Sequence, residues 1–285
     1  MIFDTHTDVL FDVINNNHSF SYHLHEMSGY YGAVLNYYFK GNESYDSFLF
    51  VLGEIKKFYK SNFNVIKKRN FILGLEGLGP LRSLSDIKLL KDAGIRIVTL
   101  TWNDSNKIAT GTYQNKKRGL TQFGRLLLNE LKKENIILDL SHLNVKSFYD
   151  VMSFYDGRMI VSHSNVRRLK NNERNLTDNQ LRILKSKNIL VGVNTYHKFV
   201  GKDINDYIKI INYLKRMIGL DKICLGLDFD YYLSNVSSGS IKGLQKADDL
   251  NNLYNSLLKE KYSLEEIENI FYKNAINFFK STLIM

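Results

Sequence analysis

The sequence predicts an α/β fold, a (β/α)8 barrel formed by one domain over residues 1–285, with extra helices after the eighth strand. Three observations favour this fold. Eight short apolar segments rich in β-branched residues are spread along the chain, and segments with helical periodicity alternate with them. No Gly/Ser-rich stretch divides the chain, whose only proline is Pro80. Eight strand and helix units are the number that closes such a barrel.

The strand candidates are nearly continuous apolar runs, as expected for a parallel sheet buried on both faces. They lie at residues 2–3, 32–39, 71–75, 95–101, 136–141, 159–162, 189–194 and 223–227. The helix candidates between them lie at residues 45–59, 84–93, 121–134, 146–155, 177–187 and 203–218. Residues 244–259 and 263–279 predict two further helices, which would cover the side of the barrel or contact a partner in a homodimer. A doubly wound open sheet is the alternative arrangement of these elements.

The charge and composition of the chain limit the kinds of partner that we expect it to bind. Lysine and arginine exceed aspartate and glutamate by 39 − 29 = 10, but they occur as short pairs, so we do not expect nucleic-acid binding. The start MIFDTHTDVL does not look like a signal peptide, and no run approaches the roughly 18 apolar residues of a membrane helix. We therefore expect a cytoplasmic protein without membrane contact. Cys224 is the only cysteine, so an intramolecular disulfide is excluded.

Metal-ligand side chains stand at the ends of the predicted strands. In the DTHTD segment, the two-residue spacing of His6 and Asp8 points both side chains to the same side of an extended chain. Four further predicted strands are followed by one such residue each: Glu76, His142, His163 and Asp228. The carboxyl ends of barrel strands converge on one rim, where imidazole and carboxylate groups suit zinc and similar divalent ions. Two ions fit this set if one carboxylate bridges them. The remaining histidines, His18, His23, His25 and His197, are interpreted as ordinary hydrogen-bonded residues.

Eight motifs in this order resemble those of the membrane (renal) dipeptidase family of zinc metallopeptidases, peptidase family M19. They are DTHTD, ILGLEG, VTLTWNDSN, GLTQFG, ILDLSH, VSHSN, ERNLTD and LGLDFD, and they span nearly the whole chain. The resemblance implies a TIM barrel of the metal-dependent hydrolase type. It also implies hydrolysis of dipeptides, L-L and in some members L-D, by a hydroxide that bridges two Zn²⁺ ions.

The resemblance assigns a role to each site residue. His6 and Asp8 would bind the first ion, His142 and His163 the second, and Glu76 both. Asp228 matches the acid that orients the attacking water and passes its proton to the leaving amine. Arg174 in ERN matches the arginine that pairs with the carboxylate of the dipeptide, a task that suits a guanidinium; without the resemblance, Arg174 would be interpreted as a solvated loop cation.

Two departures from the family's pattern concern the substrate pocket. LTWN places Trp102 where well-characterised members have a histidine that polarises the carbonyl, so Trp102, Asn103 or the ions would take over this contact. The LTWN form resembles a bacterial branch of the family. Tyr231 and Tyr232 replace the usual glycine and would narrow or reshape the pocket. Two alternatives stay open: another metal-dependent amidohydrolase or lactonase on the same barrel, and a metal-binding homologue without turnover.

Overall fold

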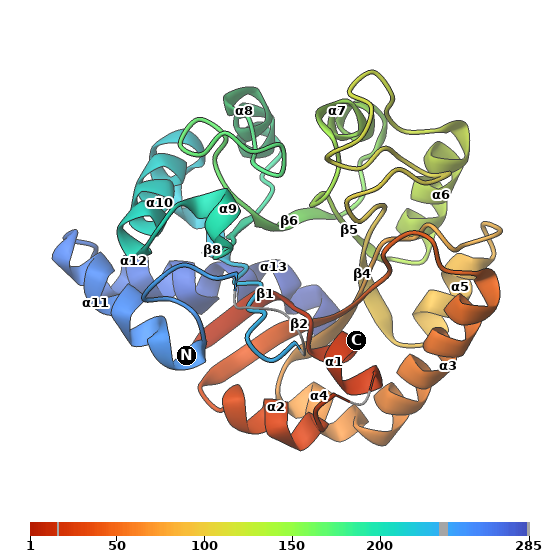
Figure 1. Cartoon of the computed structure of the whole chain (residues 1–285), viewed down its shortest axis with the longest axis horizontal. Helices are drawn as coiled ribbons and strands as arrows, with labels where there is room; N and C mark the ends of the chain where they lie inside the picture. Colours follow the sequence, from red (N-terminus) through yellow and green to blue (C-terminus); the bar gives the residue numbers. More distant parts are fainter. Residues whose placement is uncertain (16, 234–238, 284–285) are drawn as a thin grey trace. The chain divides into compact units, whose positions relative to one another are not determined.

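The computed structural model describes residues 1–15, 17–233 and 239–283. Eight strands follow one another in chain order around a closed barrel, and their pairings include parallel ladders between β1 and β8 and between β7 and β8 (Figure 1). The predicted (β/α)8 barrel is therefore confirmed. The strands are β1 (Ile2–Thr7), β2 (Tyr30–Tyr38), β3 (Phe71–Glu76), β4 (Ile95–Thr99), β5 (Ile137–Asp139), β6 (Met159–Ser164), β7 (Val191–Val193) and β8 (Ile223–Leu225).

Helices connect these strands, and most lie within a few residues of the predicted bounds. They are α1 (Val9–Ile14), α2 (Phe20–Glu26), α3 (Tyr45–Ser61), α4 (Phe63–Lys68), α5 (Asp86–Asp92), α6 (Gln122–Lys133), α7 (Val145–Phe154), α8 (Asp178–Ser186), α9 (His197–Val200), α10 (Ile204–Ile218), α11 (Leu250–Lys259), α12 (Leu264–Glu268) and α13 (Asn274–Leu283).

The structure corrects several predicted bounds. β1 extends to Thr7 and β6 to Ser164, so the motif residues expected after these strands lie largely within them. The helix expected from residue 244 begins as a 3₁₀ turn, Ala247–Asp249, and becomes α-helical at Leu250. The helix expected over residues 263–279 consists of α12, a π-helical segment, Asn269–Lys273, and α13. The sequence analysis missed the short helices α1, α2, α4 and α9, because four to seven residues show too few turns for a periodic pattern.

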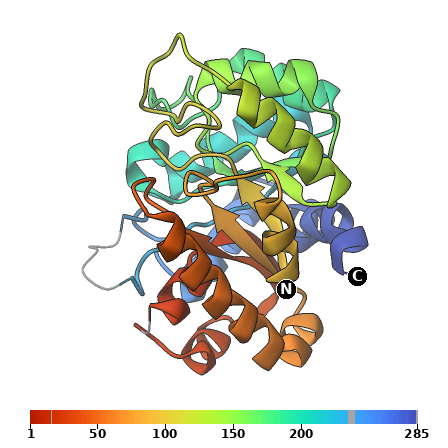
Figure 2. The ribbon, with the colours of Figure 1, turned by 90° about the vertical axis from the view of Figure 1, so that its right-hand side faces the viewer.

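The described chain divides into two compact units, residues 1–34 with 161–285 and residues 35–160. The unit boundaries fall within β2 and β6. In the first unit, the ring of Phe3 stacks on that of Phe279, which packs α13 against β1. In the second unit, α3, α5 and α6 pack in chain order (Figure 2). Helix α6 buries Leu127 and Leu131. The single domain predicted from the sequence stays a prediction.

One carbonyl group holds four strands of the first unit close together. The carbonyl oxygen of Ser162 in β6 accepts a hydrogen bond from the hydroxyl of Thr5 in β1 at 2.6 Å. A Cβ atom on Gly192 in β7, or on Gly226 just after β8, would lie 1.8 Å from this oxygen. Only glycine allows the backbones to approach so closely. These contacts position the strand ends that carry the candidate ligands.

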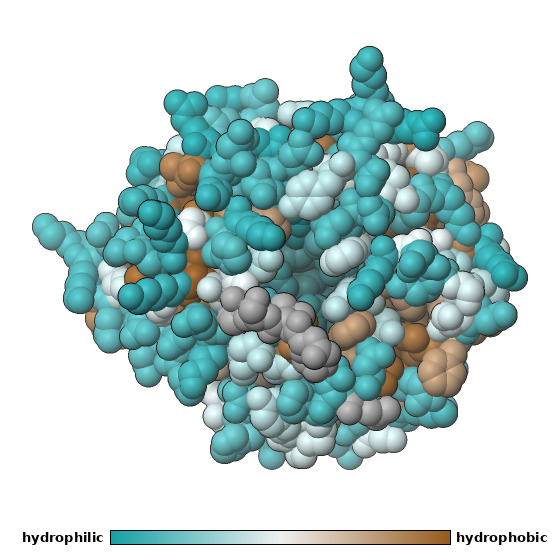
Figure 3. All heavy atoms as spheres, in the orientation of Figure 1, coloured by the Kyte–Doolittle hydropathy of each residue, from teal (hydrophilic) through white to brown (hydrophobic). Residues whose placement is uncertain are grey.

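One face of the molecule shows how polar the surface is. Hydrophilic residues cover most of the face shown in Figure 3, with hydrophobic residues scattered among them. Among the described residues, none of the helices has both the length and the apolar character that a membrane crossing requires.

Candidate metal centre

Three ligand atoms converge in the first unit. Nε2 of His6 lies 3.6 Å from Oδ1 of Asp8 and 3.7 Å from Oδ1 of Asp228. The three atoms lie within 4.8 Å of one another, close enough to hold one metal ion. His6 and Asp8 come from the end of β1, and Asp228 follows β8, its hydrogen-bonded neighbour in the sheet. The structure thus brings together residues more than two hundred positions apart in the chain.

His163 lies beside this group, at the end of β6. Its ring centroid is 3.7 Å from that of His6, and both rings are buried. Oγ of Ser162 lies 2.7 Å from Nδ1 of His163 and 3.5 Å from Nδ1 of His6. A hydrogen bond at Nδ1 fixes the ring and directs Nε2 toward a metal. Ser162 belongs to the VSHSN motif, but the sequence alone does not indicate its role beside the two rings.

The orientation of the Asp228 side chain depends on its backbone conformation and on a hydrogen bond from one side-chain amide. Its φ of 55° lies in the left-handed region, which aspartate tolerates better than most residues. Nδ2 of Asn194 donates a hydrogen bond to Oδ2 of Asp228 at 2.7 Å, and Oδ1 of Asn194 accepts one from the backbone of Tyr196. Asn194 is not among the predicted site residues, although it is the polar residue that ends a strand candidate, the same signal that indicates the ligands.

Arg174 lies in the first unit and is buried, with only 5% of the residue exposed. Its Nη2 donates a hydrogen bond to the carbonyl oxygen of His163 at 3.4 Å, and its Cζ lies 5.5 Å from the ring centroid of Phe199. This burial excludes the interpretation of Arg174 as a solvated loop cation. A buried guanidinium next to a candidate ligand is well placed to receive an anion.

The second unit carries two more predicted ligands. Nε2 of His142 lies 3.0 Å from Oε1 of Glu76, and both side chains are buried. Oδ1 of Asn103 lies 3.0 Å from Nδ1 of His142. The indole of Trp102 stacks near the His142 ring, with centroids 6.3 Å apart, and near the Tyr38 ring, with centroids 5.8 Å apart. His142 has a φ of 66°, a strained conformation that is frequent at functional sites.

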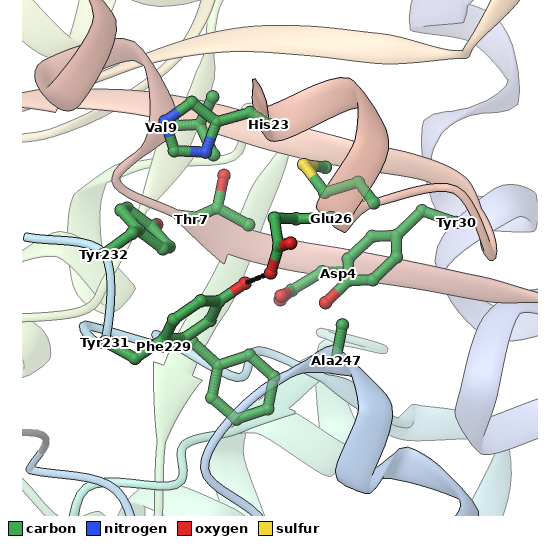
Figure 4. Close-up of a pocket in the computed structure, with 11 residues that line it drawn as sticks. Asp4, Thr7, Val9, His23, Glu26, Tyr30, Phe229, Tyr231, Tyr232 and Ala247 are labelled. Carbon is green, nitrogen blue, oxygen red and sulfur yellow. Dashed lines mark hydrogen bonds between the residues drawn. The ribbon is translucent and has the colours of Figure 1, made fainter. Parts of the chain in front are cut away.

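The hydroxyls of Tyr231 and Tyr232 both form hydrogen bonds within the first unit. The hydroxyl of Tyr231 donates to Oε2 of Glu26 at 2.9 Å, and that of Tyr232 accepts a hydrogen bond from the backbone N–H of Asp8 at 3.0 Å. Both line a cavity of about 20 Å³, shown in Figure 4 together with Asp4. Tyr232 therefore fixes the backbone of a candidate ligand.

The pKa of Asp4, which lines this cavity, is changed by its burial. Its Oδ1 accepts hydrogen bonds from the backbone of His6 and Leu227, whereas Oδ2 has no hydrogen-bond partner among the described residues. Burial raises the pKa of Asp4 to about 7, against the opposing effect of those hydrogen bonds. The cavity is large enough for about one water molecule.

Comparison with known proteins identifies the family. The model of the membrane dipeptidase family (peptidase family M19) matches residues 55–283. A dipeptidase of Schizosaccharomyces pombe is 29% identical over 222 residues, 74% of this chain and 52% of that protein. Dipeptidase tcpJ of Claviceps purpurea is 27% identical over 213 residues, 72% of this chain and 49% of that protein. The match thus spans about half the length of these two relatives.

Solved structures show the same fold. Dipeptidase AC, a metallopeptidase of family M19, has a TM-score of 0.83 at 20% identity, with 98% of this chain and 97% of that chain covered. A metallopeptidase from Rhodobacter sphaeroides, bound to a phosphinate mimic of the dipeptide L-Ala-D-Ala, has a TM-score of 0.82 at 20% identity and covers 98% of both chains. Because the family model covers most of the sequence, this chain belongs to the membrane dipeptidase family, whose members are hydrolases acting on peptide bonds.

Proposed function

We propose that this chain is a zinc-dependent dipeptidase that cleaves L-L dipeptides, and L-D dipeptides as a second class. In this proposal His6 and Asp8 bind one Zn²⁺, His142 and His163 bind another, and Glu76 binds both. The observation that carries the proposal is the convergence of Nε2 of His6 with the carboxylate oxygens of Asp8 and Asp228 in the first unit.

The donor set fits a borderline divalent ion. Nitrogen and carboxylate oxygen are the ligands that zinc accepts alongside sulfur. His142 and His163 each have a polar oxygen near Nδ1, from Asn103 and Ser162, which leaves Nε2 for a metal. When two divalent ions are bound, they supply a nucleophilic water at neutral pH and polarise the scissile carbonyl.

Asp228 is proposed as the proton carrier of the reaction. One of its oxygens faces His6 and the other accepts the Asn194 hydrogen bond, so the carboxylate keeps one oxygen directed at the ligand group. Its side chain is 24% exposed, unlike that of His6 at 2%, which leaves room for water and substrate to reach it. The carboxylate would take a proton from the attacking water and give it to the leaving amine.

Arg174, Trp102 and Asn103 are proposed to shape the substrate site. The buried Arg174 would pair with the terminal carboxylate, which favours dipeptides over longer or amidated substrates. The amide oxygen of Asn103 lies at Nδ1 of His142, so we assign Asn103 first to positioning that ring, and its Nδ2 stays a candidate donor to the substrate carbonyl. The Trp102 N–H stays a candidate donor to the substrate carbonyl.

The experiment is a panel of L-L and L-D dipeptides, a tripeptide and a lactone, assayed with and without a chelator and combined with zinc analysis. We expect about two Zn²⁺ at the candidate metal centre of each chain, and chelator-sensitive cleavage of dipeptides only. Glu76→Gln should lose nearly all turnover, whereas the surface variant Glu54→Gln should retain it. Bound zinc without dipeptide cleavage, or preferred cleavage of the lactone, would contradict the proposal.

A further inference from the structure

A second group of ligand side chains, made of other residues than the candidate metal centre, lies in the hairpin of α1 and α2 (Figure 1). Asp12 comes from α1, His18 from the connecting loop and His23 from α2. Nδ1 of His18 lies 3.0 Å and Nε2 of His23 lies 2.7 Å from the same carboxylate oxygen, Oδ2 of Asp12. Three consecutive elements of the chain thus direct one potential ligand each to a common point.

The burial of its side chains distinguishes this group from a simple surface ion pair. The side chains of Asp12 and His23 are 0% and 1% exposed, and Oδ1 of Asp12 has no hydrogen-bond partner among the described residues. A buried carboxylate oxygen without a partner is costly, because it has lost its hydration. The His18 side chain is 37% exposed, so the group is accessible to solvent from one side only.

Aromatic rings hold both imidazoles in place. His18 stacks on Tyr22 with ring centroids 4.4 Å apart, and His23 packs edge to face against Tyr232 with centroids 4.9 Å apart. Figure 4 shows the His23 ring close to Tyr232 at the cavity already described. The rings are therefore oriented before any ligand arrives, which reduces the entropic cost of binding.

We propose that Asp12, His18 and His23 form a separate structural site for one divalent transition ion of the zinc class. Two nitrogen ligands and one carboxylate suit such an ion, and the exposed side at His18 provides its entry and leaves a position for water. Ligand atoms about 2.1 Å from one ion at tetrahedral angles are about 3.4 Å apart. The observed separations would open by about 0.4 to 0.7 Å, and Oδ1 of Asp12 is the alternative ligand atom.

A bound ion would stabilise the contact of His23 with Tyr232, whose hydroxyl accepts the N–H of Asp8.

The test compares wild type, His18→Ala and His25→Ala by zinc equilibrium dialysis and elemental analysis. His25 is the matched control, because it is an exposed histidine in α2, the helix of His23, and is not part of the group. We expect wild type and H25A to bind one Zn²⁺ equivalent more than H18A, or to bind the last equivalent at least tenfold more tightly. The remaining equivalents should be the same in all three proteins.

A second measurement uses Co²⁺, whose visible absorption reports its ligands. In H18A, the absorption that arises from the Co²⁺ ion bound at Asp12, His18 and His23 should be missing. Circular dichroism should show that the variant is folded. Equal zinc content and equal Co²⁺ spectra in the three proteins would overturn the proposal, as would an equal loss in H25A. Because the comparison counts a difference in metal content, its outcome is separate from whether the chain cleaves dipeptides.

Discussion

The side-chain amide of Asn194 donates a hydrogen bond of 2.7 Å to the carboxylate of Asp228. The amide cannot rotate freely, because its own oxygen accepts the backbone N–H of Tyr196. This pair leaves the second oxygen of Asp228 facing His6. Asn194 is thus a positioning residue for the carboxylate that we propose to carry the proton.

Asn194→Ala is expected to lower kcat for dipeptides by about 10- to 100-fold, the range found for residues that orient a metal-site side chain. KM should change little, because Asn194 does not touch the proposed carboxylate anchor at Arg174. Steady-state kinetics would measure the changes in kcat and KM separately, with the exposed Asn205→Ala as the control. A rise in KM at constant kcat would show that Asn194 acts on substrate binding instead.

Asn103 orients His142 in the second unit, through the 3.0 Å contact of its oxygen with Nδ1. Asn103→Ala should weaken zinc binding about 10- to 100-fold, since the ring loses the partner that holds its tautomer. Asn103→Asp should restore or tighten binding, because a carboxylate also accepts the Nδ1 hydrogen. Competition with a chromogenic chelator would measure both affinities, with the exposed Asn115→Ala as the control. Unchanged affinity in the alanine variant would remove this role.

Arg174 gives a prediction about substrate selection. Arg174→Ala should raise KM for dipeptides by at least about tenfold, and should have a much smaller effect on C-terminally amidated analogues, which lack the anion. Arg168→Ala is the control, because Arg168 lies in the same loop region and is exposed. Equal effects on free and amidated substrates would contradict carboxylate recognition.

Asp86 gives a prediction about stability. Burial pushes the pKa of Asp86 upward, but hydrogen bonds from the backbone of Ser83 and Arg82 and from the Tyr45 hydroxyl outweigh burial and lower the pKa. The ionised carboxylate therefore stabilises the fold above about pH 4, and this contribution is lost as the pH falls through the lowered pKa.

Asp86→Asn should reduce the free energy of unfolding by about 1 to 3 kcal/mol at pH 7. The difference from wild type should narrow below about pH 4, where the wild-type carboxyl becomes protonated. Urea unfolding at several pH values would measure it. The exposed Asp92→Asn at the other end of α5 should stay within about 0.5 kcal/mol of wild type. A pH-independent difference would show that the carboxylate charge is not responsible.

The barrel could be predicted from the sequence because its strands are buried on both faces and appear as apolar runs, such as the one before Glu76. Strand ends were less predictable. In β1, Asp4 and His6 are buried polar residues inside the strand, and polarity alone suggested that the strand had ended. Their burial is compensated by hydrogen bonds from distant residues such as Leu227, which no local pattern reveals.

The ligand residues could be predicted because His, Asp and Glu at strand ends are chemically distinctive. Their supporting residues could not. Ser162, Asn194 and Tyr232 are common residue types whose roles depend on which ring or carboxylate lies opposite in space. His18 and His23 were interpreted as ordinary residues for the same reason, since their shared partner Asp12 becomes apparent only when α1 and α2 pack together.

The left-handed backbone at His142 and Asp228 affects how variants of this protein would be selected. Glycine, asparagine and aspartate adopt such a conformation at low cost, whereas β-branched residues do not. A library screened only for thermal resilience would therefore enrich glycine at position 142 and discard the imidazole. Directed evolution of this scaffold needs a turnover screen alongside any stability screen, because at position 142 the residue that best fits the backbone, glycine, lacks the imidazole.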